Sequence, residues 1–482
     1  MRFYDREKEL EALERIASHR GASLVVLTGR RRVGKSRLVG QFLQGRDAVS
    51  VLVVPKEERQ VAQDFAEALK EGPAPSFQHL REALDHFFTR SRRRFLFVDE
   101  FPNLLEVHRS LPYEFQRAWE KHRGSSDKVV LLSGSYVRMM DRIFTRQRAP
   151  LFGRAQASLV VQPLPLRVVW EIQGDLGIAD PVARIRQVCL LGGIPYYYEL
   201  LERLPRKDIV RELFFDVAAP LKEEGQNVLR QEFGAAYHKY FAILEAISGG
   251  LVAPSEIADR LGVSQTTLSK YLIALRHDFK LVDRHVPFGE RPARSKKGLY
   301  AIRDNLLAFW FAHVYGRVEP PRPEQVEEFV SRRFEQFCME FLHDHLRASG
   351  VVSSGRWWGK VRLSSGKVEP REVDLLVETE KALFVGECKW SRSPMGPRDL
   401  RRLQETSEAL PHRKPLRFVL FSKSGFELRE APELLLFDPP RISQELGRRW
   451  PPGVTADLRP DDHPGKPFLL ARRDLPDGRG SG

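Results

Sequence analysis

The feature that most constrains the fold is the octapeptide GRRRVGKS at positions 29–36, which lies between an apolar run and an amphipathic segment. The apolar run Leu24–Leu27 predicts a buried strand, and the pattern that begins near Lys35 predicts a helix. Gly29 and Gly34 let the backbone turn so that its N–H groups face inward, and the helix N-terminus adds partial positive charge. The segment therefore predicts a phosphate-binding loop. A chance Gly/Lys/Ser turn is the alternative, and the correctly placed strand and helix speak against it.

The ligand expected at this loop is ATP with Mg²⁺. Lys35 is expected to contact the β- and γ-phosphates, and Ser36 is expected to ligate the Mg²⁺ ion. The residues assigned to ATP binding along this segment are Gly29, Arg30, Arg31, Arg32, Val33, Gly34, Lys35, Ser36 and Arg37.

Polar residues follow two further apolar runs. Phe95–Val98 ends in Asp99 and Glu100, where Asp99 is expected to hold Mg²⁺ through water and Glu100 to orient or deprotonate the attacking water. An ordinary acidic strand end is the alternative. Val129–Leu132 ends in Ser133-Gly134-Ser135, whose hydroxyls, that of Ser133 first, are expected to sense the γ-phosphate unless this segment is simply a turn.

Helical patterns and short apolar runs alternate over residues 1–165, which predicts an α/β core with a parallel sheet covered by helices on both faces. A chain of 482 residues exceeds the size at which single cores stop growing, so several domains are expected. The expected units are the core at 1–165, a helical lid at 166–235, a winged helix at 236–316, a Pro-rich linker at 317–329, a small α/β domain at 330–437 and a partly disordered tail at 438–482.

The first 230 residues or so resemble a known family, the archaeal-type P-loop ATPases of the STAND class, which are relatives of the AAA proteins. This resemblance implies that the region of Arg6 and Glu7 borders the adenine pocket and that Arg154 acts as an arginine sensor or finger. Arg146 and Arg148 are equally basic neighbours, and a solvated charge is the alternative for Arg154. The matching segments are Phe3–Leu10, Gly29–Ser36, Phe95–Glu100, Leu131–Ser135, Leu151–Arg154 and Gly192–Pro195.

A helix-turn-helix is predicted further along the chain. Ser255–Leu261 has the pattern of a capped helix, Gly262 and Val263 a tight turn, and Ser264 caps a second helix that ends near His277. The expected core residues are Ile257, Leu261, Val263, Leu268, Leu272 and Leu275. Gln265, Thr266 and Lys270 are left on the face that can enter a major groove.

Two short strands around the basic loop Gly289–Gly298 complete the predicted winged helix. The loop is expected to contact phosphates through Arg291, Arg294, Lys296 and Lys297. Winged helices in ATPases also serve as lids or docking modules, so a structural role with a solvated basic loop stays open.

A third group of residues lies on the predicted strands Val373–Val377 and Leu383–Val385. Glu387 and Lys389 share one face of the second strand because strand side chains alternate, and Asp374 can meet them from the first. Asp374 and Glu387 can hold a metal ion, and Lys389 can position water or stabilise developing charge. A surface ion pair between Glu387 and Lys389 is the alternative.

This group resembles the restriction-endonuclease-like PD-(D/E)xK superfamily over about residues 330–437, and such a domain closes many of the archaeal-type ATPases. The resemblance implies an auxiliary acid at Glu335 and a later polar contact at Gln404. Val373 stands where the motif has proline, and a retained fold need not retain cleavage.

The composition is basic, with a formal net charge of +14. Such a charge favours association with nucleic acid, for which DNA is the expected form, although an Arg-rich chain without a polyanionic target has the same composition. The N-terminus lacks an apolar signal core and no apolar run is long enough to span a membrane, so a cytoplasmic protein without a membrane partner is expected. The three cysteines are too widely spaced to indicate a disulfide framework or zinc site. A homo-oligomer is left open as a further partner.

The sequence thus predicts an ATP-binding and ATP-hydrolysing switch coupled to DNA binding and to metal-dependent nucleic-acid cleavage. A non-cleaving regulator or scaffold, whose C-terminal domain only binds nucleic acid or protein, is the competing hypothesis.

Overall fold

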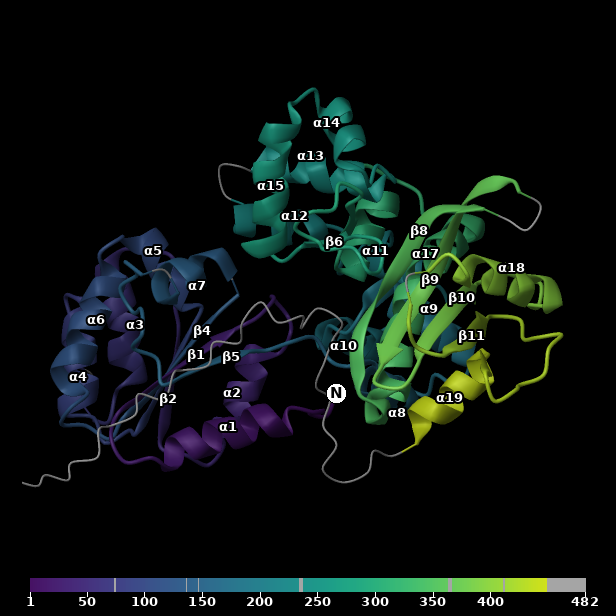
Figure 1. Ribbon diagram of the computed structural model, residues 1–482. Helices are drawn as coiled ribbons and strands as arrows, with labels where there is room; N and C mark the ends of the chain where they lie inside the picture. The colour runs from purple at the N-terminus through teal and green to yellow at the C-terminus, as the bar shows by residue number, and fades with distance from the viewer. Residues whose placement is uncertain are drawn as a thin grey trace, which may run out of the picture.

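The computed structural model describes residues 1–72, 75–135, 137–145, 147–233, 237–362, 366–410 and 412–448. In Figure 1 the N-terminal sheet with helices α1–α7 forms one body, and the C-terminal sheet with helices α8–α10 and α17–α19 forms a second. Helices α12–α15 stand above both.

The N-terminal sheet is parallel and five-stranded, as the alternation of helices and apolar runs predicts. Its strand order is β2-β3-β4-β1-β5, and every neighbouring pair is parallel. Such connections require crossovers, here supplied mostly by helices. The strands are β1 (Ser23–Thr28), β2 (Ala48–Leu52), β3 (Phe95–Asp99), β4 (Val129–Gly134) and β5 (Ala157–Val160).

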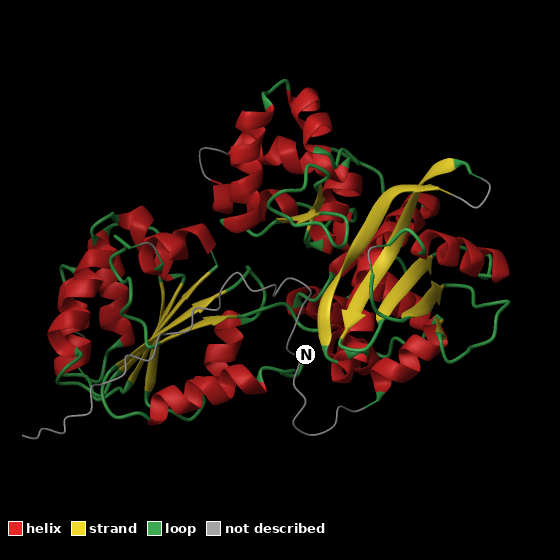
Figure 2. Ribbon diagram, in the orientation of Figure 1, coloured by secondary structure: helices red, strands yellow, loops and turns green. Residues whose placement is uncertain are grey.

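Alternating strand residues bury the two faces of this sheet in different cores. Val129 and Leu131 of β4 pack into the core that includes α1 and α2, whereas Val130 and Leu132 pack into the core with α3, α4 and α6. Figure 2 shows these helices on the two sides of the sheet. The helices are α1 (Glu7–Ser18), α2 (Lys35–Leu43), α3 (Glu58–Ala68), α4 (Leu80–Thr89), the short η1 (Phe101–Asn103) and α5 (Leu104–Val107), α6 (Leu111–His122) and α7 (Val137–Phe144).

The segment predicted as a lid is helical, but two of its helices also belong to the second body. Helix α9 packs against α17 (Pro323–His345), and both α8 and α9 pack against α19 (Pro439–Gly447). Arg167 of α8 pairs with Asp344 of α17 at 2.6 Å, and Arg186 of α9 pairs with Glu327 of α17 at 2.7 Å. The helices are α8 (Leu166–Asp175), α9 (Pro181–Leu191), α10 (Pro195–Arg203), α11 (Ile209–Phe214) and α12 (Glu224–Phe233).

Residues 237–315 form a compact helical unit with a small hairpin. Helices α14 (Pro254–Leu261) and α15 (Gln265–His277) keep the predicted bounds to within one residue, and Gly262 between them has a φ of 61°. Val263 is a correction, because its side chain is 38% exposed and does not join the core. It follows the left-handed glycine in the turn, outside both helices. The other elements are α13 (Tyr237–Ser248), β6 (Val282–His285), β7 (Leu299–Ile302), α16 (Asn305–Phe309) and a helical turn at Trp310–Val314.

The Pro-rich linker predicted at 317–329 is shorter in the structure, because helix α17 (Pro323–His345) begins inside it. Pro323 occupies the first turn, where a missing N–H costs no helical hydrogen bond. The helix is followed by η4 (Arg347–Ser349) and packs against the C-terminal sheet, whose strand order is β12-β11-β10-β9-β8. The remaining elements are β8 (Val351–Arg362), β9 (Val368–Thr379), β10 (Leu383–Lys389), α18 (Pro397–Ser407), β11 (Leu416–Ser422) and β12 (Leu434–Phe437).

The tail predicted from residue 438 begins instead with an ordered helix, α19 (Pro439–Gly447). Asp438 caps this helix by accepting a hydrogen bond from the Arg441 N–H at 2.9 Å, and Ile442 and Leu446 are buried. The Pro-rich composition was misleading because proline is well tolerated in a first helical turn. Residues 449–482 lie outside the described part of the chain.

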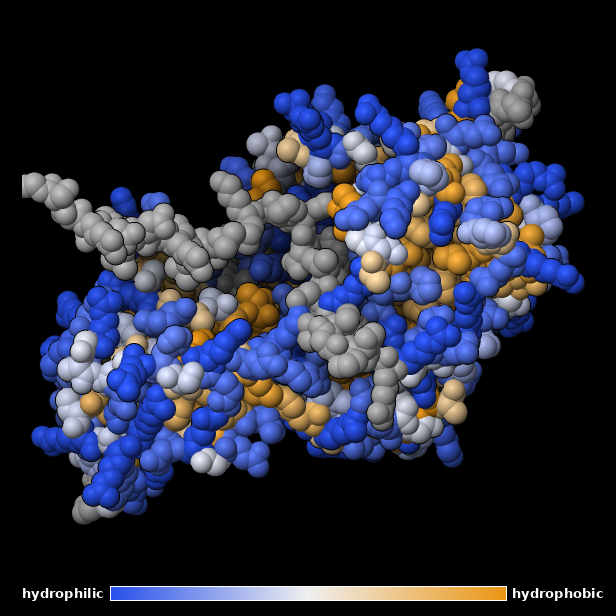
Figure 3. Space-filling model, turned by 60° about the horizontal axis from the view of Figure 1, so that its bottom comes forward, coloured by the Kyte–Doolittle hydropathy of each residue, from blue (hydrophilic) through white to orange (hydrophobic). Residues whose placement is uncertain are grey.

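Much of the face visible in Figure 3 is hydrophilic, with apolar residues in smaller areas between charged ones. Within the described ranges, every helix is either too short or too polar to cross a membrane.

Candidate functional site

The backbone of the loop at 29–36 depends on two glycines. Gly29 has a φ of 151°, and a Cβ atom there would lie 2.5 Å from the Val161 carbonyl oxygen. Gly34 has a φ of 97° and is the N-cap residue immediately before α2. A side chain at either position would strain the turn. The two glycines therefore let the loop backbone lie close to the N-terminus of α2, where a bound anion is favoured.

Lys35 lies buried within this loop. Its ammonium group donates to the carbonyl oxygens of Gly29 at 2.9 Å and Arg30 at 3.1 Å, and to the Ser135 hydroxyl at 2.8 Å. A cation held at the centre of a phosphate-binding loop suits the role predicted for Lys35.

Ser36 and Asp99, the two residues predicted to hold Mg²⁺, meet in the structure. The Ser36 hydroxyl donates to Asp99 Oδ2 at 2.6 Å, and the Ser133 hydroxyl donates to Asp99 Oδ1. Hydroxyl and carboxylate oxygens are the donor set that Mg²⁺ prefers. Ser36, Asp99 and Ser133 therefore fit a Mg²⁺ ion, although Ser36 and Ser133 lie 97 positions apart in the sequence.

Glu100 is held by Ser135, a contact that sequence reasoning did not assign. The Ser135 N–H donates to Glu100 Oε2 at 3.1 Å, and its hydroxyl donates to Oε1 at 2.5 Å. Because the same hydroxyl accepts from Lys35, one serine joins the predicted base to the loop lysine. The only available signal was its place two residues after Ser133 at the end of β4.

Arg6, which the resemblance places at the adenine pocket, lies against the phosphate loop. One terminal nitrogen donates to the carbonyl oxygens of Val33 at 3.3 Å and Gln162 at 2.6 Å, and the other pairs with Glu9 at 3.1 Å. Arg37, by contrast, donates to the Met1 carbonyl.

Arg154 is engaged elsewhere. Its Nε donates to Glu120 of α6 at 2.6 Å, and another nitrogen donates to the Phe152 carbonyl at 3.0 Å. The structure therefore pairs this arginine with α6 and shows no contact between it and the phosphate loop among the described residues. Arg148 is exposed, and Arg146 lies outside the described residues.

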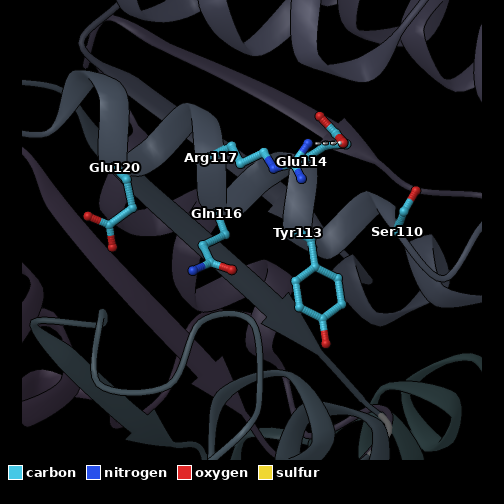
Figure 4. Close-up of a pocket in the computed structure, with 6 residues that line it drawn as sticks. All are labelled: Ser110, Tyr113, Glu114, Gln116, Arg117 and Glu120. Atoms are coloured by element: carbon cyan, nitrogen blue, oxygen red, sulfur yellow. Dashed lines mark hydrogen bonds and ion pairs between the residues drawn. The ribbon is translucent and has the colours of Figure 1, made fainter.

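A hollow of about 590 Å³ runs along α6. Figure 4 shows its side chains projecting from one helix and its N-terminal flank, with Arg117 paired to Glu114. None of the predicted nucleotide-site residues lines it. The lining residues are Ser110, Tyr113, Glu114, Gln116, Arg117 and Glu120.

Two arginines of the phosphate loop bind acids of the neighbouring helical units. Arg30 pairs with Asp304, and Arg32 pairs with Glu224 at 2.5 Å while its guanidinium lies over the Tyr196 ring. Burial alone would lower the pKa of Arg30, but the Asp304 carboxylate and further acids raise it overall. Arg31 also has an electrostatic or hydrogen-bonding partner. Sequence reasoning placed all three arginines at the nucleotide and gave no signal for Asp304 or Glu224.

The predicted DNA-contacting residues are exposed on two elements. Gln265, Thr266 and Lys270 lie on the exposed side of α15. The basic loop between β6 and β7 exposes Arg291, Arg294 and Lys296, whereas Lys297 pairs with Glu290 at 2.7 Å.

The C-terminal acids converge at the junction of β9 and β10. These antiparallel strands pair Gly386 with Leu375, which places Glu387 beside Asp374 on the next rung. Asp374 Oδ2 also accepts from the Cys388 N–H at 2.9 Å. Burial and the nearby Asp374 charge raise the pKa of Glu387 to about 7, and burial raises the pKa of Asp374.

Glu335 and Lys389 complete this acidic site less directly. Burial raises the pKa of Glu335 to about 7, while Arg356 pairs with it at 2.8 Å and opposes that rise. The Lys389 ammonium pairs with Asp399 of α18 at 3.4 Å, and Gln404 is exposed on the same helix. In the described ranges, no three His, Cys, Asp or Glu side chains are grouped closely enough to form a ready metal cluster. Asp374 and Glu387 alone still offer oxygen donors of the kind that Mg²⁺ and Mn²⁺ bind.

Comparison with known proteins finds similarity over two parts of the chain. Residues 3–201 match a family described as an ATPase domain predominantly from Archaea, and residues 312–403 match a family described as archaeal and bacterial proteins of unknown function. The uncharacterized protein MJECL04 of Methanocaldococcus jannaschii is 27% identical over 426 residues, which cover 83% of this chain and 90% of that protein.

Two solved structures are similar over most of their own length. The Walker-type ATPase of Pyrococcus abyssi has a TM-score of 0.48 and 20% identity, with 64% of this chain and 96% of that one covered. The ORC2 protein of Aeropyrum pernix has a TM-score of 0.46 and 18% identity, with 68% and 94% covered.

The family match covers the phosphate loop, Asp99, Glu100 and Ser133, and it agrees with the parallel sheet that holds them. The chain is therefore an ATP-hydrolysing enzyme with a P-loop ATPase domain.

Proposed function

We propose that this ATPase is a nucleotide-dependent switch that binds DNA through residues 236–316 and cleaves nucleic acid through its C-terminal domain in a metal-dependent reaction. The observation that carries the proposal is the pair formed by Asp374 and Glu387, which lie on adjacent strands with Lys389 following on the same strand.

The proposed ATPase chemistry uses the residues around the phosphate loop. Lys35 binds the phosphates, Ser36 and Asp99 hold Mg²⁺, and Glu100 orients or deprotonates water. A bound Mg²⁺ ion neutralises charge that develops on the transferred phosphoryl group. Ser135 positions Glu100 through two hydrogen bonds, so its loss is expected to affect catalysis more than nucleotide binding.

The proposed DNA contacts use α14 and α15 as a helix-turn-helix and the β6–β7 hairpin as a wing. Exposed Gln265, Thr266 and Lys270 fit a major-groove surface, and exposed cations of the hairpin loop fit phosphate contacts. A formal net charge of +14 supports a polyanionic partner.

In the proposed nuclease, Asp374 and Glu387 hold a divalent ion. When bound, such an ion would activate a water molecule as the nucleophile and neutralise charge at the scissile phosphate. Both acids must be ionised for this role. Because the pKa of Glu387 is raised to about 7 and that of Asp374 is also raised, metal binding is expected to strengthen as the pH rises through the pKa of Glu387. Lys389, which pairs with Asp399 in this structure, acts on water or developing charge once it leaves that carboxylate.

The test is an ATPase assay run in parallel with a DNA- and RNA-degradation assay in Mg²⁺ or Mn²⁺. Asp374→Ala and Glu387→Ala are expected to lose metal binding and cleavage, whereas Lys389→Ala keeps metal binding and cleaves poorly. All three keep DNA-independent ATP hydrolysis. Absence of cleavage by the wild-type protein, with and without ATP, contradicts the nuclease assignment, and so does cleavage that survives both acid variants.

A non-cleaving regulator is the second candidate, because the Lys389 ammonium is paired with Asp399 and not with Glu387. In that case the C-terminal domain binds nucleic acid or protein without cleaving it. The wild-type protein and the variants with neutralised acids then all hydrolyse ATP, and all show only background degradation of DNA and RNA.

A further inference from the structure

We propose that Arg356 is a tethered cation that occupies the acidic site in competition with a divalent metal ion, and that residues 286–298, the wing loop between β6 and β7, hold it there. This inference rests on the proposed nuclease function and names a regulation of that same site.

A β-bulge places Arg356 at the site. The pairing of β8 with β9 shifts between Gly355, opposite Leu376, and Trp357, opposite Val373, so Arg356 alone faces Leu375 and Asp374. Bulges change the direction of a side chain and are frequent near active sites. Here the shift brings an arginine to the acid that is predicted to hold metal.

The Arg356 side chain is already engaged with the acids. Its Nη2 atom pairs with Glu335 Oε2 at 2.8 Å, and its charge lowers the pKa values of both Glu335 and Asp374 against the larger effect of burial. Its Nε atom is buried and has no hydrogen-bond partner in the described structure. The side chain is nevertheless 39% exposed, so it has a route to solvent when a stronger cation binds the acids.

The wing loop is attached to this same residue. The Phe288 N–H donates to the Arg356 carbonyl oxygen at 2.7 Å, and the Phe288 ring lies against Gly355 and in the apolar cluster that contains Trp357. β8 is an edge strand, so its outer carbonyl groups are open to such pairing. The backbone position of Arg356 therefore depends on where the wing loop lies.

The charge of Arg356 predicts the direction in which its loss changes metal affinity. A guanidinium group and a divalent cation repel each other strongly at a few ångströms in a partly buried site. Removing the guanidinium charge is expected to tighten metal binding by roughly tenfold or more, since tenfold corresponds to only about 1.4 kcal/mol. Nucleic acid that draws the wing loop away from β8 has the same effect on the site.

The test measures Mn²⁺ dissociation constants by titration calorimetry on the full chain at pH 8. Arg356→Met, which keeps an unbranched apolar stem, is expected to bind Mn²⁺ roughly tenfold more tightly than wild type, and Arg356→Lys to stay near wild type. Equal or weaker binding by Arg356→Met overturns the inference. Asp374→Ala in both backgrounds identifies the site, and circular dichroism confirms that each variant is folded.

The outcomes separate the inference from the proposed function. Asp374-dependent Mn²⁺ binding that does not respond to Arg356→Met removes the inference alone. Failure of wild type and Arg356→Met to bind Mn²⁺ removes the proposed metal site and the inference with it.

The wing-loop part is tested by Phe288→Ala, which is expected to tighten Mn²⁺ binding in the same direction but less than Arg356→Met. Ala293→Ser, an exposed wing-loop change on a side chain outside this contact, is the matched control and leaves the dissociation constant unchanged. An unchanged value in Phe288→Ala shows that the loop does not hold Arg356.

Discussion

Arg30 of the phosphate loop forms an ion pair with Asp304, which lies 274 positions later in the chain and caps helix α16. Asp304 directly follows Arg303, which pairs with Asp283 of β6. A side chain of the nucleotide-binding loop thus contacts the segment that carries the β6–β7 hairpin. This contact gives the proposed switch a physical connection between its ATP site and its DNA-binding unit.

Asp304→Asn is expected to destabilise the protein by about 1–3 kcal/mol, because it leaves a partly buried Arg30 without its counter-charge. Asparagine still caps α16, so the loss reports the ion pair and not the helix. The measurement is the urea unfolding midpoint. Asp216→Asn breaks the exposed Arg211–Asp216 pair and is the control, with an expected change near zero. Equal midpoints for Asp304→Asn and wild type contradict the proposed connection.

Lys35→Ala is expected to abolish tight ATP binding or turnover, because it removes the charge that contacts the β- and γ-phosphates. Its buried ammonium group also binds Gly29, Arg30 and Ser135, so folding is checked by circular dichroism. The measurement is a phosphate-release assay with nucleotide titration. Wild-type turnover by folded Lys35→Ala removes the assignment of this loop.

Glu100→Gln is expected to bind ATP normally and to hydrolyse it at least roughly a hundredfold more slowly, because general-base assistance contributes about that factor or more. Ser135→Ala is expected to lower turnover less, since it releases Glu100 without removing the carboxylate. Single-turnover kinetics distinguish slower chemistry from slower product release. If Glu100→Gln instead loses tight ATP binding, Glu100 has a structural role.

DNA binding is expected to weaken, and to depend less on salt, in a variant that neutralises four wing-loop cations together, because phosphate contacts release counterions. These cations are Arg291, Arg294, Lys296 and Lys297. The loss is expected to be nearly independent of DNA sequence. Fluorescence anisotropy at several salt concentrations measures both quantities. If affinity and salt slope stay at their wild-type values, the loop has another role.

Glu387→Gln is expected to stabilise the protein at pH 8 by about 1–3 kcal/mol more than at pH 5. Burial, followed by the charge of Asp374, raises the folded-state pKa of Glu387 from 4.5 to about 7. The folded protein therefore binds more protons than the unfolded chain between these values, so wild-type stability falls as the pH rises through this window. Thermal unfolding across pH 5–8 measures it, and a pH-independent effect of Glu387→Gln contradicts a raised pKa at this carboxyl group.

Local patterns were sufficient for much of the fold. The phosphate loop, its flanking strand and α2 follow from the spacing of Gly29, Gly34 and Lys35, because turn geometry and helix initiation depend on near neighbours. The same holds for α14 and α15, which meet at Gly262. The predictions for Val263 and for residues 439–447 were wrong, because burial there depends on which distant surface covers these residues.

The sequence by itself determined that a phosphate loop would stand at the end of a buried strand, that Asp99 and Glu100 would end another strand, and that Asp374 and Glu387 would lie on neighbouring strands. Only the tertiary structure decided which charged side chains pair with one another. Arg154 binds Glu120, Arg30 binds Asp304, and Arg356 reaches Glu335 from β8, a strand that no sequence pattern had indicated, beside a bulge in β9. The physical reason is that backbone conformation follows short-range sterics and hydrogen bonding, whereas the partner of a charged side chain is chosen by whichever opposite charge the packing of distant elements brings within reach.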